Sequence, residues 1–289
     1  MLATVSGSPV HYAQDGSGTP VLAVHGAGVD HREIRAGLEA VFADRSGYRR
    51  IYPDLPGMGR TPLPATVGSN DDVVEVLLGL VDAVIGDEAF LLVGQSYGGY
   101  LARAIASRRP GQIAGLALIC SADAQTAAED VPGHVVVHAA SDVDADAALG
   151  PQQAAEYRDY LVVQTVATLR RYQEAVAPAV DLVDQAGLGR VFQRWRLRTP
   201  PEQGPAYPNP TLILAGRQDA SVGYAPSWRL LEHYPRATFA VLDRAGHAVL
   251  HEQVGLVTAL LEEWLDRVRE HQLQGAVRAQ RVRCDRDWW

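Results

Sequence analysis

Short apolar runs alternate with longer amphipathic stretches along most of this chain of 289 residues. The apolar runs are rich in Val, Leu and Ile and cover residues 20–26, 49–55, 89–95, 113–120, 210–216 and 237–243. Continuous apolar runs of this length are typical of strands that are buried on both faces, as in a parallel sheet. The pattern therefore predicts a parallel sheet at the centre of the fold.

The amphipathic stretches between these runs predict helices at residues 30–43, 71–86, 97–109, 225–234 and 252–270. In the last stretch, Val257, Leu261, Trp264 and Val268 recur at the spacing that places them on one helix face. Strands that alternate with helices predict an α/β fold with a mostly parallel, doubly wound sheet. Residues 3–18 are more polar and predict an antiparallel hairpin at the sheet edge.

The alternation is interrupted between about residues 131 and 207, where no clear buried strand occurs. Residues 151–180 and 181–197 each carry apolar residues at helical spacing. The stripe of the first stretch comprises Val162, Val166, Leu169, Tyr172 and Val176. We interpret 131–207 as a helical cap insertion in a core domain formed by 1–130 and 208–271, followed by an irregular tail at 272–289.

The composition is that of an ordinary globular protein, with 47% apolar and 21% charged residues. A net charge of −8 argues against a nucleic-acid surface. We see no signal peptide and no apolar stretch of membrane-spanning length, so we expect a cytoplasmic protein without a membrane partner. Two cysteines, Cys120 and Cys284, form neither a disulfide framework nor a metal site.

One motif carries chemistry: Ser96 lies between Gly94 and Gly98, after the apolar run 89–95 and before the helical stretch 97–109. A serine flanked in this way at a strand-to-helix turn is typical of a nucleophile elbow. Glycines are needed because side chains on either side of such a tight turn would collide with backbone. At the helix N-terminus, free N–H groups and the helix dipole favour an oxyanion.

With this elbow and four further motifs, the sequence resembles the α/β-hydrolase superfamily over nearly its whole length. The further motifs follow predicted strands and lie at residues 25–28, 53–61, 216–219 and 245–247. The resemblance implies a catalytic triad in which Ser96 is the nucleophile, His247 the base and Asp219 the acid. A serine hydroxyl is a poor nucleophile until a neighbouring base takes its proton, and a carboxylate orients that base.

The resemblance also implies an oxyanion hole formed by the backbone N–H groups of Ala27 and Tyr97. Asp123, just after the run 113–120, is an alternative acid, because some family members place the acid there. Candidate substrate-binding residues are His25, Gly26, Phe192 and Trp195. For His25, an alternative interpretation is that it braces its loop by hydrogen bonding.

No cofactor or metal is expected. Residues 26–31 begin like a dinucleotide fingerprint, but His31 stands where the last glycine belongs. His134 and His138 have a chelating spacing only on a helix, and the valines between them favour an extended chain instead.

These features predict a hydrolase that cleaves a small carboxylic ester, thioester or lactone with an apolar part through an acyl-enzyme. One alternative is carbon–carbon bond hydrolysis of ring-fission dienoates, which similar proteins perform with the same triad. Those enzymes typically carry Trp directly after the catalytic His, whereas Ala248 follows His247 here. The same triad also suits cofactor-free haloperoxidase or perhydrolase activity, and a ligand sensor on a hydrolase fold is a further candidate.

Overall fold

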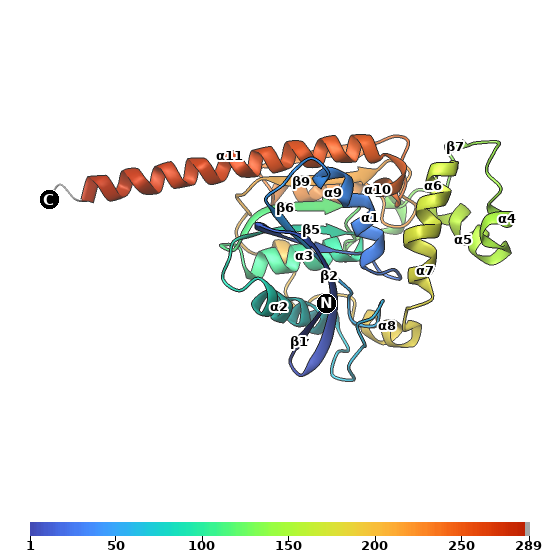
Figure 1. Ribbon diagram of the computed structural model, residues 1–289, viewed down its shortest axis with the longest axis horizontal. Helices are drawn as coiled ribbons and strands as arrows, with labels where there is room; N and C mark the ends of the chain where they lie inside the picture. Colours follow the sequence, from blue (N-terminus) through green and yellow to red (C-terminus); the bar gives the residue numbers. More distant parts are fainter. Residues whose placement is uncertain (287–289) are drawn as a thin grey trace.

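The computed structural model describes residues 1–286, and for Ala276 and 278–286 it describes the backbone alone. At its centre lies an eight-stranded sheet with the order β1-β2-β4-β3-β5-β6-β9-β10 (Figure 1). These strands are β1 (Leu2–Val5), β2 (Ser8–Gly16), β3 (Thr19–Val24), β4 (Tyr48–Pro53), β5 (Phe90–Gln95), β6 (Ile113–Ile119), β9 (Thr211–Gly216) and β10 (Ala237–Leu242). Strand β2 pairs in antiparallel fashion with β1 and with β4, and the other described pairs of this sheet are parallel. The predicted parallel sheet with an edge hairpin is confirmed.

Helices cover both faces of this sheet, because successive strand residues point to opposite sides. Leu22 and Val24 pack in one apolar cluster with α2 and α3, whereas Val21 and Ala23 pack in a second one with α1 and α11. The core helices are α1 (His31–Phe42), α2 (Asn70–Val84), α3 (Tyr97–Arg108), α9 (Ala225–Arg229), α10 (Val249–Glu252) and α11 (Val254–Arg286). Strand β10 differs from the prediction, since it lies at the sheet edge and is half-buried.

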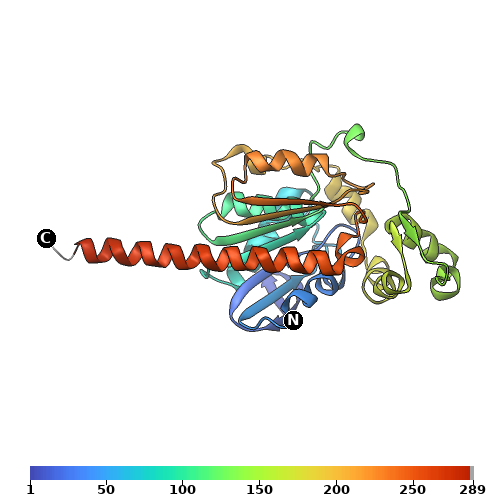
Figure 2. The ribbon, with the colours of Figure 1, turned by 90° about the horizontal axis from the view of Figure 1, so that it is seen from above.

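The segment between β6 and β9, which the sequence predicts to be a cap and which is called the cap below, has most of its elements at one end of the molecule in Figures 1 and 2. They are β7 (His138–Ala139), α4 (Ala145–Leu149), α5 (Pro151–Tyr160), β8 (Val163–Gln164), α6 (Val166–Arg171), a π-helical turn (Tyr172–Val176), α7 (Ala177–Val180) and α8 (Gln185–Phe192). Tyr157, Leu161 and Tyr172 form an apolar cluster of the cap that also includes Ala248 of the core. The cap therefore packs directly beside His247.

The helix predicted over 151–180 is wrong at its middle. It breaks after Tyr160, and β8 pairs in parallel with β7. The physical reason is tertiary: the N–H groups of Val162 and Val163 donate to the carboxylate of Glu252, so they form no helical bonds.

The irregular tail predicted from residue 272 is also wrong, because α11 continues to Arg286. The sequence of this stretch is free of proline and rich in residues with good helix propensity, such as Ala, Arg, Gln and Leu. Figures 1 and 2 show that α11 runs past the body, away from the cap. The last part of the predicted tail, 287–289, lies outside the described residues. Within residues 1–286, no helix is both long and apolar enough to cross a membrane.

Candidate active site

Ser96 occupies a strained turn between β5 and α3. Its φ of 53° and ψ of −119° lie in a region that residues with side chains rarely adopt. A Cβ atom at Gly94 would lie 2.4 Å from the Gly98 oxygen, and one at Gly98 would lie 2.1 Å from the Val24 oxygen. Only glycine fits at either position, so the three residues together lift the serine hydroxyl above the sheet.

Ser96, His247 and Asp219 form a continuous hydrogen-bonded chain. The Ser96 Oγ lies 2.9 Å from His247 Nε2, and His247 Nδ1 lies 2.9 Å from Asp219 Oδ2. Asp219 follows β9 and His247 follows β10, so both stand at the carboxyl edge of the parallel strands, where ligands bind in such sheets. The other oxygen of Asp219 accepts the N–H groups of Ser221 and Val222, which fixes the buried carboxylate.

The surroundings of His247 make it a stronger base than a free histidine. Burial lowers its pKa, but the charge and hydrogen bond of Asp219 outweigh that effect, and Glu33 and Glu252 act in the same direction, so the pKa is raised. For Asp219, burial favours the neutral acid, yet His247 and the Val222 and Ser221 amides hold its pKa below the ordinary value. The geometry therefore favours an ionised Asp219 beside a basic imidazole.

Asp123, the alternative acid, lies in a different network. Its carboxylate pairs with the guanidinium of Arg103 at 2.8 Å and accepts the N–H of Gln125. Arg103 in turn binds Glu202 of the chain that leads from the cap back to β9. Of the two carboxylates, the structure places Asp219 against His247.

The sequence predicts an oxyanion hole formed by the backbone N–H groups of Tyr97 and Ala27. Tyr97 is the first residue of α3, and Ala27 lies in the loop after β3. Within residues 1–286, neither amide has a hydrogen-bond acceptor. Gly26 lets this loop approach the elbow, since a Cβ there would lie 3.1 Å from the Ser96 Cβ.

His25 is fully buried, and both of its ring nitrogens are engaged. Its Nε2 accepts the Leu55 N–H at 3.0 Å, so Nδ1 carries the proton and donates to the Gly26 oxygen at 2.7 Å. These bonds fit the interpretation in which His25 braces the oxyanion loop.

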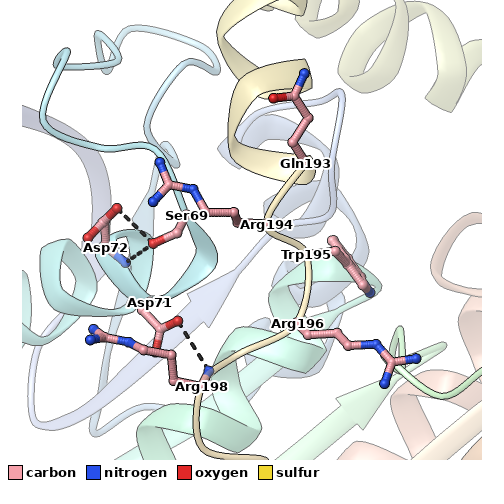
Figure 3. A pocket seen from close by; sticks show the side chains of 8 residues that line it. All are labelled: Ser69, Asp71, Asp72, Gln193, Arg194, Trp195, Arg196 and Arg198. Atoms are coloured by element: carbon pink, nitrogen blue, oxygen red, sulfur yellow. Dashed lines mark hydrogen bonds and ion pairs between the residues drawn. The ribbon is translucent and has the colours of Figure 1, made fainter.

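Phe192 and Trp195 pack against aromatic side chains of α3. Both rings contact Tyr97, at centroid distances of 5.2 Å and 5.5 Å, and Trp195 also stacks on Tyr100 at 5.4 Å. Trp195 lines a surface cavity of about 610 Å³ (Figure 3), whose walls contain no triad residue. Substrate contact by these two residues stays a prediction.

The residues that join the cap to the triad were not predicted from the sequence. The ring of Tyr160, at the end of α5, meets the His247 imidazole edge to face at a centroid distance of 6.5 Å. Its hydroxyl donates to Glu33 at 3.4 Å, and Glu252 accepts N–H groups from the cap. The sequence signal is weak: Glu33 falls on the same buried face of α1 as Leu38 and Val41, and Glu252 comes five residues after His247.

Two side-chain groups combine residue types that can bind metals. One contains His11, His31 and Asp54, and the other contains Cys120 with Asp219 and His247. In the first group, Nδ1 of each histidine hydrogen-bonds to a carboxylate oxygen of Asp54. The second group overlaps the hydrogen-bonded chain that leads to Ser96.

Comparisons with known proteins agree with this geometry. The model of the alpha/beta hydrolase family matches residues 21–259. A 2-hydroxymuconate semialdehyde hydrolase of Pseudomonas sp. (strain CF600) is 28% identical over 86% of this chain and 88% of its own. An alpha/beta superfamily hydrolase of Oenococcus oeni PSU-1 has a TM-score of 0.83 at 25% identity, covering 93% of this chain and 99% of that one.

A thermophilic esterase of Thermogutta terrifontis has a TM-score of 0.68 at 26% identity, covering 93% of this chain and 98% of that one. Because the family model spans most of the chain, from β3 into α11, the fold and the sequence lead to the same assignment. This chain belongs to the alpha/beta hydrolase family and is a hydrolase.

Proposed function

We propose that the chain hydrolyses small carboxylic esters, thioesters or lactones through an acyl-enzyme. The observation that carries this proposal is the hydrogen-bonded chain from Ser96 Oγ through His247 to Asp219, at 2.9 Å for each bond. A nucleophile, a base and an orienting carboxylate in this arrangement suit acyl transfer.

In the first half of the reaction, Ser96 Oγ attacks the ester carbonyl while its proton passes to His247 Nε2. The resulting oxyanion accepts hydrogen bonds from the N–H groups of Ala27 and Tyr97. When the tetrahedral intermediate collapses, the bond to the alkoxy oxygen breaks and His247 gives its proton to the leaving alcohol. Loss of one oxyanion donor typically costs about 3–4 kcal/mol of transition-state stabilisation.

In the second half, water attacks the acyl carbonyl and gives a proton to His247. The intermediate then collapses and expels Ser96 Oγ, which recovers this proton as the acid product leaves. Asp219 holds Nδ1 of the imidazole protonated throughout, so that Nε2 faces the serine. The cap packs beside His247 through Tyr160, which favours compact acyl groups over long lipid chains.

A second candidate is carbon–carbon bond hydrolysis of a ring-fission product. It is favoured by the similarity to the 2-hydroxymuconate semialdehyde hydrolase over most of both chains. The residue after His247 argues against it. Enzymes of that kind typically carry Trp at this position, whereas this chain has Ala248, a small side chain buried in the cap cluster.

The test combines covalent labelling with turnover. A fluorophosphonate probe should label Ser96 in the wild type, Ser96→Ala should lose labelling, and Ser17→Ala, at an exposed turn, should keep it. Labelling that persists in Ser96→Ala would refute the nucleophile.

Turnover separates the two candidates. We would measure kcat/KM for p-nitrophenyl esters of increasing acyl length and for 2-hydroxymuconate semialdehyde. The best ester should give a larger kcat/KM than the semialdehyde. Preference for the semialdehyde would replace ester cleavage by carbon–carbon cleavage.

A further inference from the structure

A buried carboxylate outside the triad joins the catalytic histidine loop to the cap. Glu252, the last residue of α10, is only 9% exposed. Its Oε2 accepts the N–H of Gly246 at 2.7 Å, and Gly246 directly precedes His247. Its Oε1 accepts the N–H groups of Val162 and Val163, at 2.7 Å and 3.1 Å. One side chain thus binds three backbone donors from two segments.

Neither segment satisfies these donors by itself. Helix α5 ends at Tyr160, and the chain then extends so that the Val162 carbonyl accepts N–H groups from β7 and the residue before it. The N–H groups of Val162 and Val163 are left facing the core. A buried N–H without an acceptor is costly, so Glu252 is needed where the cap meets the core.

The same cap segment contacts the histidine loop directly. A Cβ atom at Gly246 would lie 2.8 Å from a methyl group of Val162, so the Val162 side chain packs directly against the Gly246 backbone. Beside this contact, the Tyr160 ring lies against His247 and its hydroxyl reaches Glu33, which also bonds His251 Nε2 at 3.1 Å. Residues 160–163 are therefore attached to the core next to His247, through the Tyr160 ring and through the Glu252 carboxylate.

We propose that Glu252 is a positioning residue that holds residues 160–163 of the cap and the loop 245–247 together as one unit. In this unit the imidazole stays aimed at Ser96 and Tyr160 stays beside it. The inference rests on the proposed function, because it concerns His247 acting as the base. A displacement of about 1 Å at reacting groups can cost about 100-fold in rate, so such a support matters.

Two substitutions separate this geometric role from a purely electrostatic one. Glu252→Gln keeps the shape but offers a single acceptor oxygen, and its NH₂ group would face an N–H donor of one segment. Glu252→Asp keeps the charge but is shorter by one methylene, so it cannot reach both segments. Glu270→Gln makes the same exchange at an exposed site of α11 and serves as the control.

The experiment measures the second-order rate of fluorophosphonate labelling of Ser96, together with kcat and KM for p-nitrophenyl acetate and the pH profile. We expect Glu252→Gln and Glu252→Asp to slow labelling and kcat about 10- to 100-fold, while Glu270→Gln matches the wild type. Both variants should react slowly. The acid limb of the pH profile should move to lower pH more in Glu252→Gln, which loses the negative charge near His247, than in Glu252→Asp, which keeps it. Wild-type rates in both variants, or a loss confined to Glu252→Gln, would overturn the proposal.

Native-state hydrogen exchange on the wild type provides a measurement that needs no variant. The amides of Gly246, Val162 and Val163 should open together, with the same free energy of opening. Independent opening of Gly246 would overturn the proposal even if the variants failed to fold. If the wild type is not labelled at Ser96, the proposed function fails instead, which is a distinguishable result.

Discussion

The imidazole of His247 lies near three acidic side chains, Asp219, Glu33 and Glu252, and each of them favours its protonated form. A general base must be neutral to act, so kcat/KM should fall as the pH drops through the raised pKa of His247. We expect the acid limb of the pH profile to have its midpoint above the ordinary histidine value of 6.5.

Asp219→Asn removes the strongest of these charges and leaves burial, which disfavours the charged imidazole. The midpoint should therefore move to lower pH, and kcat should fall by up to about 10⁴-fold. Asp123→Asn, which touches a different network, should stay within about tenfold of the wild type with an unmoved midpoint. The reverse pattern would make Asp123 the acid.

The resemblance to the α/β-hydrolase superfamily was enough to group Ser96 with His247 and Asp219, although it left Asp123 open as the acid, and the three side chains do form one hydrogen-bonded chain. The same reasoning could not find Glu33, Tyr160 or Glu252. Their role depends on contacts between segments about 90 or more positions apart, as for Glu252 with Val162. The sequence shows an acidic residue among apolar ones, but it does not show which distant segment that side chain binds, so its role cannot be inferred.

At the scale of elements, the turn from β5 to α3 has no room for an added methyl group. Gly98→Ala would place a Cβ atom 2.1 Å from the Val24 oxygen, which is backbone and cannot move aside easily. We expect a loss of several degrees in Tm and of Ser96 labelling, since the strand-to-helix turn must open. Gly111→Ala, at a site with nothing within 4 Å, should leave both unchanged. Normal labelling in Gly98→Ala would show that the elbow tolerates a side chain.

The centre of the sheet was predictable because β3, β5, β6 and β9 are buried on both faces, which leaves continuous apolar runs in the sequence. The cap was less so. Its elements are short. Residues 161–165 have a helical apolar pattern but adopt an extended conformation, because their backbone groups bond to Glu252 and to β7 and not to each other. The periodicity of apolar residues is a local signal and cannot predict hydrogen bonds to distant segments.

At the scale of the molecule, α11 has two parts. Its first part packs on the core through Trp264, Leu265 and Val268, which are nearly inaccessible, whereas residues 272–275 are exposed. Removal of residues 275–289 should therefore change Tm by no more than about 2 °C and leave kcat/KM unchanged. Truncation after Glu263, which removes the buried part, should prevent folding. A large loss with the shorter deletion would show that the distal helix contacts the body or another copy.

The distal end of α11 points away from the cap (Figures 1 and 2). The Met1 amine, in contrast, donates to the Tyr12 oxygen at 2.6 Å within the sheet edge. A fluorophore or a solid support attached to the distal end of α11 would therefore be held far from the catalytic loops. Immobilised in this way, the hydrolase would keep its substrate-facing end turned toward the solution, which an attachment at the N-terminus would not ensure.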